Sequence, residues 1–439
     1  MISRLLHGLG AAALLLSTGA SAALRPAEQT MVRTVDAEQQ RTIAMLQRWV
    51  DQNSGTLNLK GVEAVRDMVA PEFKALGFTT EWIDMKAAGR AGHLVARHAG
   101  RANGKRLLLI AHLDTVFEPD SPFQHWVQQG DIAHGPGAGD DKGGIAVIVA
   151  ALRAMQAAGT LKGANITVFM TGDEEDAGDP LSISRRDLIA EGRRADVALD
   201  FEDLAQKSGP SGPLDMGSIA RRSAASWTVT VTGRSAHSSG VGMPGVGYGA
   251  IYELARIIDQ FRRELPEDKL TYNVGLVGGG QTVALDPGKI RLEATGKTNI
   301  IAAAAVARGD LRAISEDQVQ RTRDKMRAIV AQSLPGAKAD IAFEEGYPPM
   351  PPTAGNRALL ARLNAVNADM GLAQMGELDP AERGAGDISF VAKDVDGLVG
   401  LGPASSGSHT ASETVDIPSI SKQAKRAAIL MSRLAAEKR

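Results

Sequence analysis

Histidine and carboxylate side chains gather in this sequence where buried strands are predicted to end. The apolar run Leu107–Ile110 predicts a parallel strand, and the alternation of side chains along a strand turns His112 and Asp114 to the same side. A glycine-rich turn then leads to two adjacent aspartates, Asp140 and Asp141, at the start of a helix. Imidazole and carboxylate donors at strand ends predict a site for a divalent metal ion.

Further acidic groups follow the next two predicted strands. The strand Asn165–Met170 leads into an acidic run that contains Glu174 and Glu175, and the following strand ends at Glu202. Two neighbouring glutamates can divide the labour, because one can bind a metal ion while the other transfers protons. His409 is the only histidine in the final third of the chain.

Each of these motifs also has an ordinary explanation. A histidine can be a satisfied buried side chain or lie in a surface loop, and an acidic run is usually solvated surface. A nucleotide-binding loop is disfavoured at Asp140, because the glycines do not follow G-x-G-x-x-G and two aspartates would repel a phosphate. Adjacent carboxylates are costly unless a cation compensates them, which favours a metal ion.

The composition narrows the kind of metal site and disfavours several classes of protein. The 439 residues contain no cysteine, so disulfides, thiol catalysis and cysteine-ligated zinc are excluded, and histidine and carboxylates must hold any metal. The length allows two or three domains. A net charge of −2 and a hydrophobic content of 44% are typical of a soluble globular protein and do not indicate binding to nucleic acid or to an anionic membrane.

Residues 1–22 resemble a secretory signal peptide. Arg4 supplies a positive charge, Leu9–Leu16 a short apolar core, and Ala20-Ser21-Ala22 a cleavage site of the A-x-A type. The apolar run is shorter than the roughly 20 residues that span a bilayer, so we expect no membrane span once the signal is removed. The sequence therefore predicts a secreted or periplasmic protein.

Strands and helices alternate through the first half of the chain, which predicts a three-layer αβα domain with a mixed, mostly parallel sheet. Helices are expected at 35–51, 61–76, 144–158 and 186–191, and strands at 78–83, 92–98, 107–110, 165–170 and 197–201. Ligands bind beyond the carboxyl ends of strands in such sheets, and all the acidic motifs lie there.

Two breaks rich in turn residues, at 207–217 and at 347–352, divide the chain. We expect residues 23–217 and 347–439 to form a catalytic domain, closed by a helix from about Ser419, and residues 218–346 to form an inserted α+β domain. Within the insert, strands at 227–232, 271–277, 305–312 and 340–344 and helices at 249–263 and 316–334 give the order β-α-β-β-α-β, which resembles a ferredoxin-like fold.

Taken together, the motifs resemble those of peptidase family M20, whose dizinc exopeptidases and aminoacylases include glutamate carboxypeptidase, aminoacylase and succinyl-diaminopimelate desuccinylase. Four motifs occur in the family's order: the H-x-D at His112, the G-x-x-D-x-K-G-G at Asp140, the D-E-E at Glu174, and the late His409. The spacings are closest to the glutamate carboxypeptidase branch, and the resemblance covers nearly the whole mature chain.

The resemblance implies two divalent metal ions, zinc in the first place, with cobalt or manganese as alternatives that suit the same ligands. It implies five ligands: Asp140 as the bridge between both ions, His112 and Glu202 on one ion, and Glu175 and His409 on the other. Asp200 is the alternative to Glu202, because other branches use an aspartate at about that point. The peptide bond after the bridging aspartate is often cis in the family.

The remaining residues of the expected centre have supporting or catalytic roles in the family. Asp114 would orient His112, and Asp141 would be a supporting neighbour. Glu174 would be the general base, which takes a proton from a water that bridges the metal ions and passes it to the leaving amine.

The inserted domain is expected, by the same resemblance, to act as a lid and to form a homodimer. His237 matches a lid histidine that reaches the substrate oxyanion, often across the dimer interface, and Asn299 and Arg312 match residues that grip a substrate's terminal carboxylate. Arginine suits this task because its planar fork binds a carboxylate in a bidentate way. The alternative for Arg312 is a structural ion pair with a neighbouring acid.

We therefore expect a zinc-dependent, carboxypeptidase-like metallo-exopeptidase that cleaves a peptide or N-acyl amide bond next to a C-terminal amino acid with a free α-carboxylate. Its substrates would be small peptides or N-acyl amino acids. An aminoacylase, a deacylase or a dipeptidase of the same family is the alternative within enzymes, and a non-catalytic relative that binds metal or peptide is the alternative outside them. Departures from the family pattern at 176–180, 300–303 and 384–387 leave the preferred side chain of the substrate open.

Overall fold

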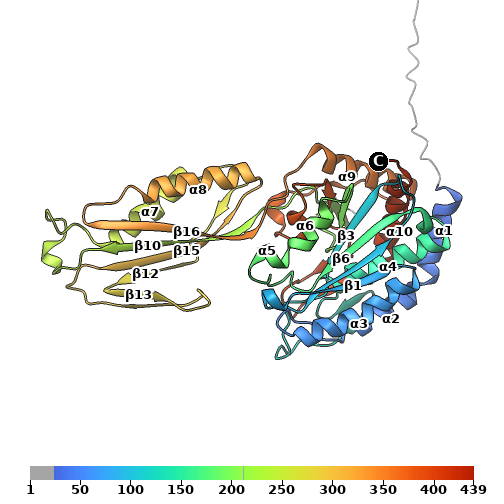
Figure 1. Ribbon diagram of the computed structural model, residues 1–439, viewed down its shortest axis with the longest axis horizontal. Coiled ribbons are helices and arrows are strands. Elements are labelled where there is room, and N and C mark those ends of the chain that lie inside the picture. The colour runs from blue at the N-terminus through green and yellow to red at the C-terminus, as the bar shows by residue number, and fades with distance from the viewer. Residues whose placement is uncertain (1–23, 211) are drawn as a thin grey trace, which may run out of the picture.

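The computed structural model describes residues 24–439 apart from residue 211, so the signal peptide expected at residues 1–22 lies outside the described residues. Figure 1 shows two bodies joined by a narrow connection. We call the smaller one, residues 224–347, the inserted body, and the larger one, which both ends of the described chain build, the main body.

A six-stranded sheet with the order β1-β2-β6-β3-β7-β18 forms the centre of the main body. Its strands are β1 (Thr79–Asp84), β2 (Gly92–His98), β3 (Arg106–His112), β6 (Asn165–Thr171), β7 (Val197–Asp200) and β18 (Gly397–Leu398). The last four strands in this order run parallel, whereas β1 and β2 pair antiparallel. The predicted mixed, mostly parallel sheet is confirmed, and the carboxyl ends of β3, β6 and β7 meet at one edge.

Helices cover both faces of this sheet, so the main body has three layers (Figure 1). The side chains of β3 alternate between two buried clusters, with Leu107 and Leu109 in one and Leu108 and Ile110 in the other. The first cluster includes α1 (Pro26–Ala37), α2 (Gln39–Val50), α3 (Leu59–Ala75), α4 (Lys142–Ala157), α9 (Ala354–Asp369) and α10 (Ile417–Ala436). The second includes α6 (Arg186–Gly192), which follows the short helix α5 (Leu181–Ser184).

The helix expected at 35–51 is instead two helices, α1 and α2, that meet at Glu38. α1 begins earlier than expected, with Pro26 in its first turn, where the missing N–H leaves no hydrogen bond unmade. Val35 and Leu46 lie on opposite sides of the break but face the same core. The apolar spacing therefore continues through the break and could not reveal it.

The two helices of the inserted body and the strands of its main antiparallel sheet follow the predicted β-α-β-β-α-β order, and a separate two-stranded hairpin precedes β15. The main sheet runs β11 and β12, β15, β10, β16. The elements are β10 (Ala224–Gly233), α7 (Ala250–Glu264), β11 (Thr271–Tyr272), β12 (Leu276–Gly280), β15 (Ala304–Arg312), α8 (Glu316–Val330) and β16 (Ala337–Tyr347). A hairpin of β13 (Thr282–Leu285) and β14 (Leu292–Thr295) was not predicted, because its side chains are mostly exposed and lack a buried apolar face.

The connection between the bodies consists of two chain segments that lie side by side. Arg221 and Met350 exchange two backbone hydrogen bonds of 2.9 Å, and Ala224 pairs with Tyr347 at the start of the sheet. The insert therefore leaves and re-enters the main body at the same place.

Short strands tie distant segments together at the edges of the main body. One small sheet contains β4 (Val127–Gln129), β5 (Ile132–His134), β20 (Thr414–Asp416) and β19 (Ser405–Ser406), and it brings the segment around His409 beside the loop that precedes Asp140. The loop expected at 207–217 is a hairpin of β8 (Gln206–Gly209) and β9 (Gly212–Gly217), which pairs with β17 (Gly376–Glu377). Within the described part of the chain, no helix combines the length and apolar character needed to cross a bilayer.

Candidate metal centre

His112 is the last residue of β3, and its imidazole is buried between two aspartates. Its Nε2 atom is 3.0 Å from Asp140 Oδ1, and its Nδ1 atom is 3.1 Å from the backbone oxygen of Asp114 and 3.4 Å from Asp114 Oδ1. Burial lowers the pKa of His112, but the contacts with Asp114 and Asp140 outweigh burial and raise that pKa well above its usual value. The imidazole is therefore held in a strongly negative environment.

Asp114 is fully buried behind His112 and fixes two parts of the site at once. Its Oδ2 accepts hydrogen bonds from the Thr56 hydroxyl (2.7 Å) and from the backbone N–H of Glu175 (3.1 Å). Its Oδ1 accepts one from the backbone N–H of Glu174 (3.1 Å). Burial raises the pKa of Asp114, but His112 and these donors lower it on balance. One carboxylate thus lies against the imidazole and holds the segment that follows β6.

Asp140 follows the glycine-rich loop just before α4, and its peptide bond to Asp141 is cis. Burial raises the pKa of Asp140, but hydrogen bonds from His112 and His409 outweigh burial, so the pKa is lowered and the carboxylate is ionised. Asp141 is turned differently, because its Oδ2 accepts a hydrogen bond from the backbone N–H of His112 (3.2 Å). Its Oδ1 is buried with no hydrogen-bond partner among the described residues.

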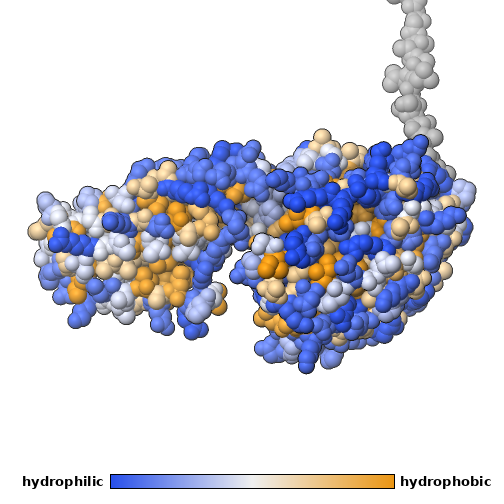
Figure 2. Space-filling view, in the orientation of Figure 1, coloured by the Kyte–Doolittle hydropathy of each residue, from blue (hydrophilic) through white to orange (hydrophobic). Residues whose placement is uncertain are grey.

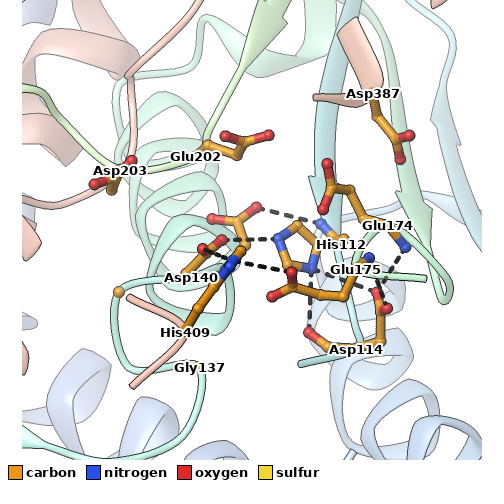
Figure 3. A network of polar contacts seen from close by, with 12 residues as sticks. His112, Asp114, Gly137, Asp140, Glu174, Glu175, Glu202, Asp203, Asp387 and His409 are labelled. Atoms are coloured by element: carbon orange, nitrogen blue, oxygen red, sulfur yellow. Dashed lines mark hydrogen bonds and ion pairs between the residues drawn. The ribbon is translucent and has the colours of Figure 1, made fainter. Parts of the chain in front are cut away.

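His409 reaches the same place from the far end of the chain. Its Nε2 atom is 3.0 Å from Glu175 Oε2 and 3.3 Å from Asp140 Oδ2. Hydrogen bonds to Asp140 and Glu175 raise the pKa of His409 to about 11. Figure 3 shows the side chains of His112, Asp140, Glu175 and His409 pointing toward one another.

This donor set fits a divalent metal ion. Ligand atoms of His112, Asp140 and Glu175 all lie within 4.8 Å of one another, and His409 adjoins two of these residues. The raised pKa values of both histidines express a surplus of negative charge that a cation would neutralise. Imidazole nitrogens and carboxylate oxygens without a thiolate suit zinc, cobalt and manganese alike.

Glu202 lies close to this group but is held by arginines. Its Oε2 atom is 2.7 Å from Arg221 Nη2 and 3.6 Å from Arg383 Nη2, and Figure 3 shows its carboxylate apart from the converging side chains. Asp200 is also buried, and its Oδ2 atom is 3.5 Å from Arg221 Nη1. Glu202 lines the pocket of the metal centre and Asp200 does not. Of these two carboxylates, the geometry favours Glu202 as the one that could face a ligand.

The converging side chains open onto a pocket of about 280 Å³. Asp140, Glu174, Glu202 and His409 line it together with Arg221, Arg383 and the loop at 382–385. Burial raises the pKa of Glu174 well above its usual value, and the nearby Glu202 carboxylate raises it further. A carboxyl group in such an environment is suited to accept a proton and return it.

Sequence reasoning missed the buried residues that support the Glu174 segment. Arg185 is fully buried, and it donates through Nη1 to Asp173 Oδ1 (2.6 Å) and through Nε to Asp387 Oδ1 (2.8 Å). Tyr347, the last residue of β16, donates its hydroxyl to the backbone oxygen of Glu174. In the sequence, Asp387 was noted only because it lies in a segment that departs from the family pattern. Tyr347 was noted only as the first residue of the second domain break. Arg185 gave no signal in the sequence.

Glu413 was missed as well. It lies four residues after His409 and is 1% exposed, and its carboxylate accepts hydrogen bonds from backbone N–H groups of the loop that ends at Asp140. Burial and the nearby Asp140 carboxylate raise the pKa of Glu413 to about 7.

The three residues expected to hold the substrate do not line the pocket of the metal centre. His237 and Asn299 are neighbours on the inserted body, where the backbone N–H of Ser238 donates to the backbone oxygen of Asn299 (2.9 Å). β10 begins at the connection, where Ala224 pairs with Tyr347, and runs away from the main body in Figure 1; His237 follows the far end of this strand, which is Gly233. Arg312 Nε donates to Asp310 Oδ2 (3.0 Å), which is the structural ion pair that the sequence left open.

Comparison with known proteins shows the family of the chain. A family model described as "Peptidase family M20/M25/M40" matches residues 108–433. Carboxypeptidase G2 of Pseudomonas sp. (strain RS-16) is 29% identical to this chain over 426 residues, which cover 94% of this chain and 93% of that protein.

Solved structures share the fold. The aminopeptidase PepT from Bacillus cereus ATCC 10987 aligns with a TM-score of 0.72 at 17% sequence identity, covering 90% of this chain and 99% of that one. A dinuclear metal binding peptidase of the M20 family from Bacillus subtilis aligns with a TM-score of 0.63 at 16% identity, covering 91% and 99% of the two chains.

Proposed function

The chain belongs to peptidase family M20/M25/M40 and is a metallo-exopeptidase or amidohydrolase. On this premise, we propose that it is a zinc-dependent enzyme that acts on small peptides or N-acyl amino acids. It would release a C-terminal amino acid with a free α-carboxylate from them. The observation that carries the proposal is the convergence of His112, Asp140, Glu175 and His409, of which Asp140 and His409 line one pocket together with Glu174. The similarity to carboxypeptidase G2, which extends along nearly the whole chain, supports a carboxypeptidase-like activity.

The chain offers ligands for two divalent ions. Asp140 presents one oxygen to His112 and the other to His409, which is the arrangement that a shared ligand requires. His112 and Glu202 would complete the coordination of one ion after Glu202 gives up its contact with Arg221. Glu175 and His409 would complete the coordination of the other ion. Bound there, the ions would lower the pKa of water to about 7 and polarise the carbonyl of the scissile bond.

Glu174 is the residue that we assign to proton transfer. Its backbone N–H is fixed by Asp114 and its backbone oxygen by Tyr347, so the side chain leaves the segment from a rigid base and enters the pocket. From there the carboxylate can take a proton from the attacking water and give it to the nitrogen of the leaving amine.

The substrate-binding residues would come from a second copy of the chain. His237 and Asn299 lie together on the inserted body and do not line the pocket of the metal centre of their own chain. The same body exposes Ile251 and Val277 at an apolar pocket between α7 and β12, and Tyr252 is exposed next to Ile251. Figure 2 shows apolar surface on the inserted body. An exposed apolar patch of this kind supports a homodimer. In the dimer, Arg312 would then release Asp310 and form its ion pair with the substrate carboxylate instead.

Residues 1–22 support export, so the enzyme would act in the periplasm or outside the cell. Sequencing the N-terminus of the protein recovered from cell fractions tests this: a mature chain that starts at Ala23 outside the cytoplasm supports export, and an intact Met1 in the cytoplasm contradicts it.

The activity is tested with zinc-loaded protein on matched substrates. We expect hydrolysis of N-acyl-glutamate and other N-acyl amino acids with a free carboxylate, and little or none of the same compounds with an amidated carboxylate, because the amide removes the group that the enzyme grips. Hydrolysis of dipeptides with a free amino group in preference to N-acyl amino acids would favour the dipeptidase alternative.

The role of Glu174 is tested with Glu174→Gln, which keeps the shape of the side chain and removes its basicity. We expect kcat to fall by about 10²- to 10⁴-fold while the metal content measured by atomic emission stays the same. Asp176→Asn is the matched control, because Asp176 lies in the same acidic run but its side chain is 61% exposed and pairs with Arg90. Full activity of Glu174→Gln would contradict the mechanism.

A further inference from the structure

A buried carboxylate connects the two loops that carry the ligands Asp140 and His409. Glu413 accepts hydrogen bonds through Oε1 from the backbone N–H groups of Gly139 (3.0 Å) and Asp140 (3.2 Å), and through Oε2 from that of Gly137 (3.2 Å). Three donors from one loop thus converge on one side chain, as in the backbone nests that bind anions.

This arrangement is costly and therefore calls for a function. Glu413 is 1% exposed, and the ion pairs found among the described residues include none for it. The buried Lys142 ammonium attracts the Glu413 carboxylate but donates its hydrogen bonds to the backbone oxygens of Gln52 and Pro136. The three N–H donors are therefore the hydrogen bonds that offset the lost hydration of Glu413, and they offset it only in part. Glu413 also lies next to Asp140, so the two negative charges repel each other.

Two glycines of the loop fit it closely against its surroundings. Gly137 has a φ of 76°, in the left-handed region that favours glycine, and a Cβ atom at Gly139 would lie 2.3 Å from Ser405 Cβ. The segment after Glu413 continues into β20, which pairs with β5 in the chain just before the loop. The loop before Asp140 and the segment after His409 are therefore held together by the Glu413 hydrogen bonds and by the pairing of β20 with β5.

We propose that Glu413 is a positioning residue that holds the Asp140 loop and the His409 loop at the separation at which both side chains can bind the same metal ion. This inference rests on the proposed function, since it assumes that the centre binds two ions. Without the carboxylate, the loop N–H groups lose their acceptor, and Asp140 and His409 are no longer fixed relative to each other.

The test is metal binding, measured apart from catalysis. Metal-free wild-type protein and Glu413→Gln are titrated with zinc in competition with a chromogenic chelator. Gln retains one acceptor oxygen but places an NH₂ group against the loop N–H donors. We therefore expect zinc to bind about 10- to 100-fold more weakly at the second metal site. After dialysis, the variant should retain one zinc ion instead of two. Asp286→Asn is the matched control, because Asp286 also accepts backbone N–H groups of its loop, at Ile290 and Arg291, but lies on the inserted body.

The outcomes separate this inference from the proposed function. Thermal melting of the metal-free proteins must show that Glu413→Gln is folded, and if it is not, Glu413→Asp takes its place, since it keeps the charge and shortens the reach by one methylene. A loss of zinc affinity in a folded variant supports the inference, and two ions bound with wild-type affinity overturn it. Wild-type protein that binds two ions but hydrolyses none of the substrates would overturn the proposed function alone.

Discussion

Replacing Arg185 with Met removes a buried positive charge and keeps most of the length of the side chain. The guanidinium is fully buried and donates to the Asp173 carboxylate (2.6 Å), to the Asp387 carboxylate (2.8 Å) and to the backbone oxygen of Asp173 (2.8 Å). Both carboxylates are almost inaccessible to water, with 0% and 3% of their side chains exposed. In Arg185→Met they stay buried without their cation.

The structure sets the size of the effect. Removing one partner from a buried ion pair costs about 3–5 kcal/mol, because an uncompensated charge is left behind. Arg185 serves two carboxylates, so we expect the upper part of that range, a loss of about 4–5 kcal/mol in the free energy of unfolding of the main body. The triple variant Arg185→Met, Asp173→Asn, Asp387→Asn removes the stranded charges and should recover more than half of this loss.

The assay is urea unfolding followed by far-ultraviolet circular dichroism, fitted with separate transitions for the two bodies because a chain of two bodies need not unfold in one step. Arg186→Met is the matched control, since the neighbouring Arg186 pairs with Asp187 on the surface and its side chain is 63% exposed. The control should lose less than about 1 kcal/mol. A loss of less than about 1 kcal/mol in Arg185→Met, or a triple variant no more stable than the single one, would refute this reasoning.

Three further predictions address the metal loop, the inserted body and the oligomer. Gly139→Ala would place a Cβ atom 2.3 Å from Ser405 Cβ, so we expect a loss of about 1–3 kcal/mol in stability and a lower metal content by atomic emission, and an unchanged metal content would contradict it. Hydrogen bonds from Arg308 lower the pKa of Glu344 to about 2 from 4.5, so this pair stabilises the inserted body above pH 4.5 and its contribution is lost as the pH falls through 2. Glu344→Gln should therefore cost about 1 kcal/mol at pH 6, after allowance for solvent screening, and nothing below pH 2 in thermal melts, whereas an equal cost at both pH values would argue against the pair. Ile251→Asp places a charge on the exposed apolar patch of α7 and should convert a dimer into monomers in analytical ultracentrifugation, and an unaltered dimer would exclude this face as the interface.

The architecture was predictable because burial leaves a mark in the sequence. Leu107–Ile110 is apolar throughout, since both faces of β3 are covered, and the residues that follow such a strand must emerge at the edge of the sheet. The same logic, together with the family's motif order, named His112, Asp140, Glu175 and His409, whose side chains converge in the structure.

The supporting contacts were not predictable for a different reason. Arg185 binds Asp387, a partner 202 residues away, and Glu413 binds a loop more than 270 residues before it. Neither residue lies in a periodic pattern that would indicate burial. Charged side chains usually face solvent, so the sequence predicts that both residues are exposed. The pairing of Glu202 with Arg221 was hidden although the two residues are close in the sequence, because the β8–β9 hairpin lies between them and no periodic pattern connects them.

The backbone pairing of Arg221 with Met350 also affects how the chain folds. Before β18 can join the sheet, the main body must bring these two points together across the whole insert, and closing so long a flexible loop costs entropy. A folded insert brings its own ends together, so for the rest of the chain it behaves like a short turn. By loop-closure arithmetic this shortcut is worth on the order of 2 kcal/mol, which predicts that the insert folds first and that a tight turn could replace it without disturbing the sheet.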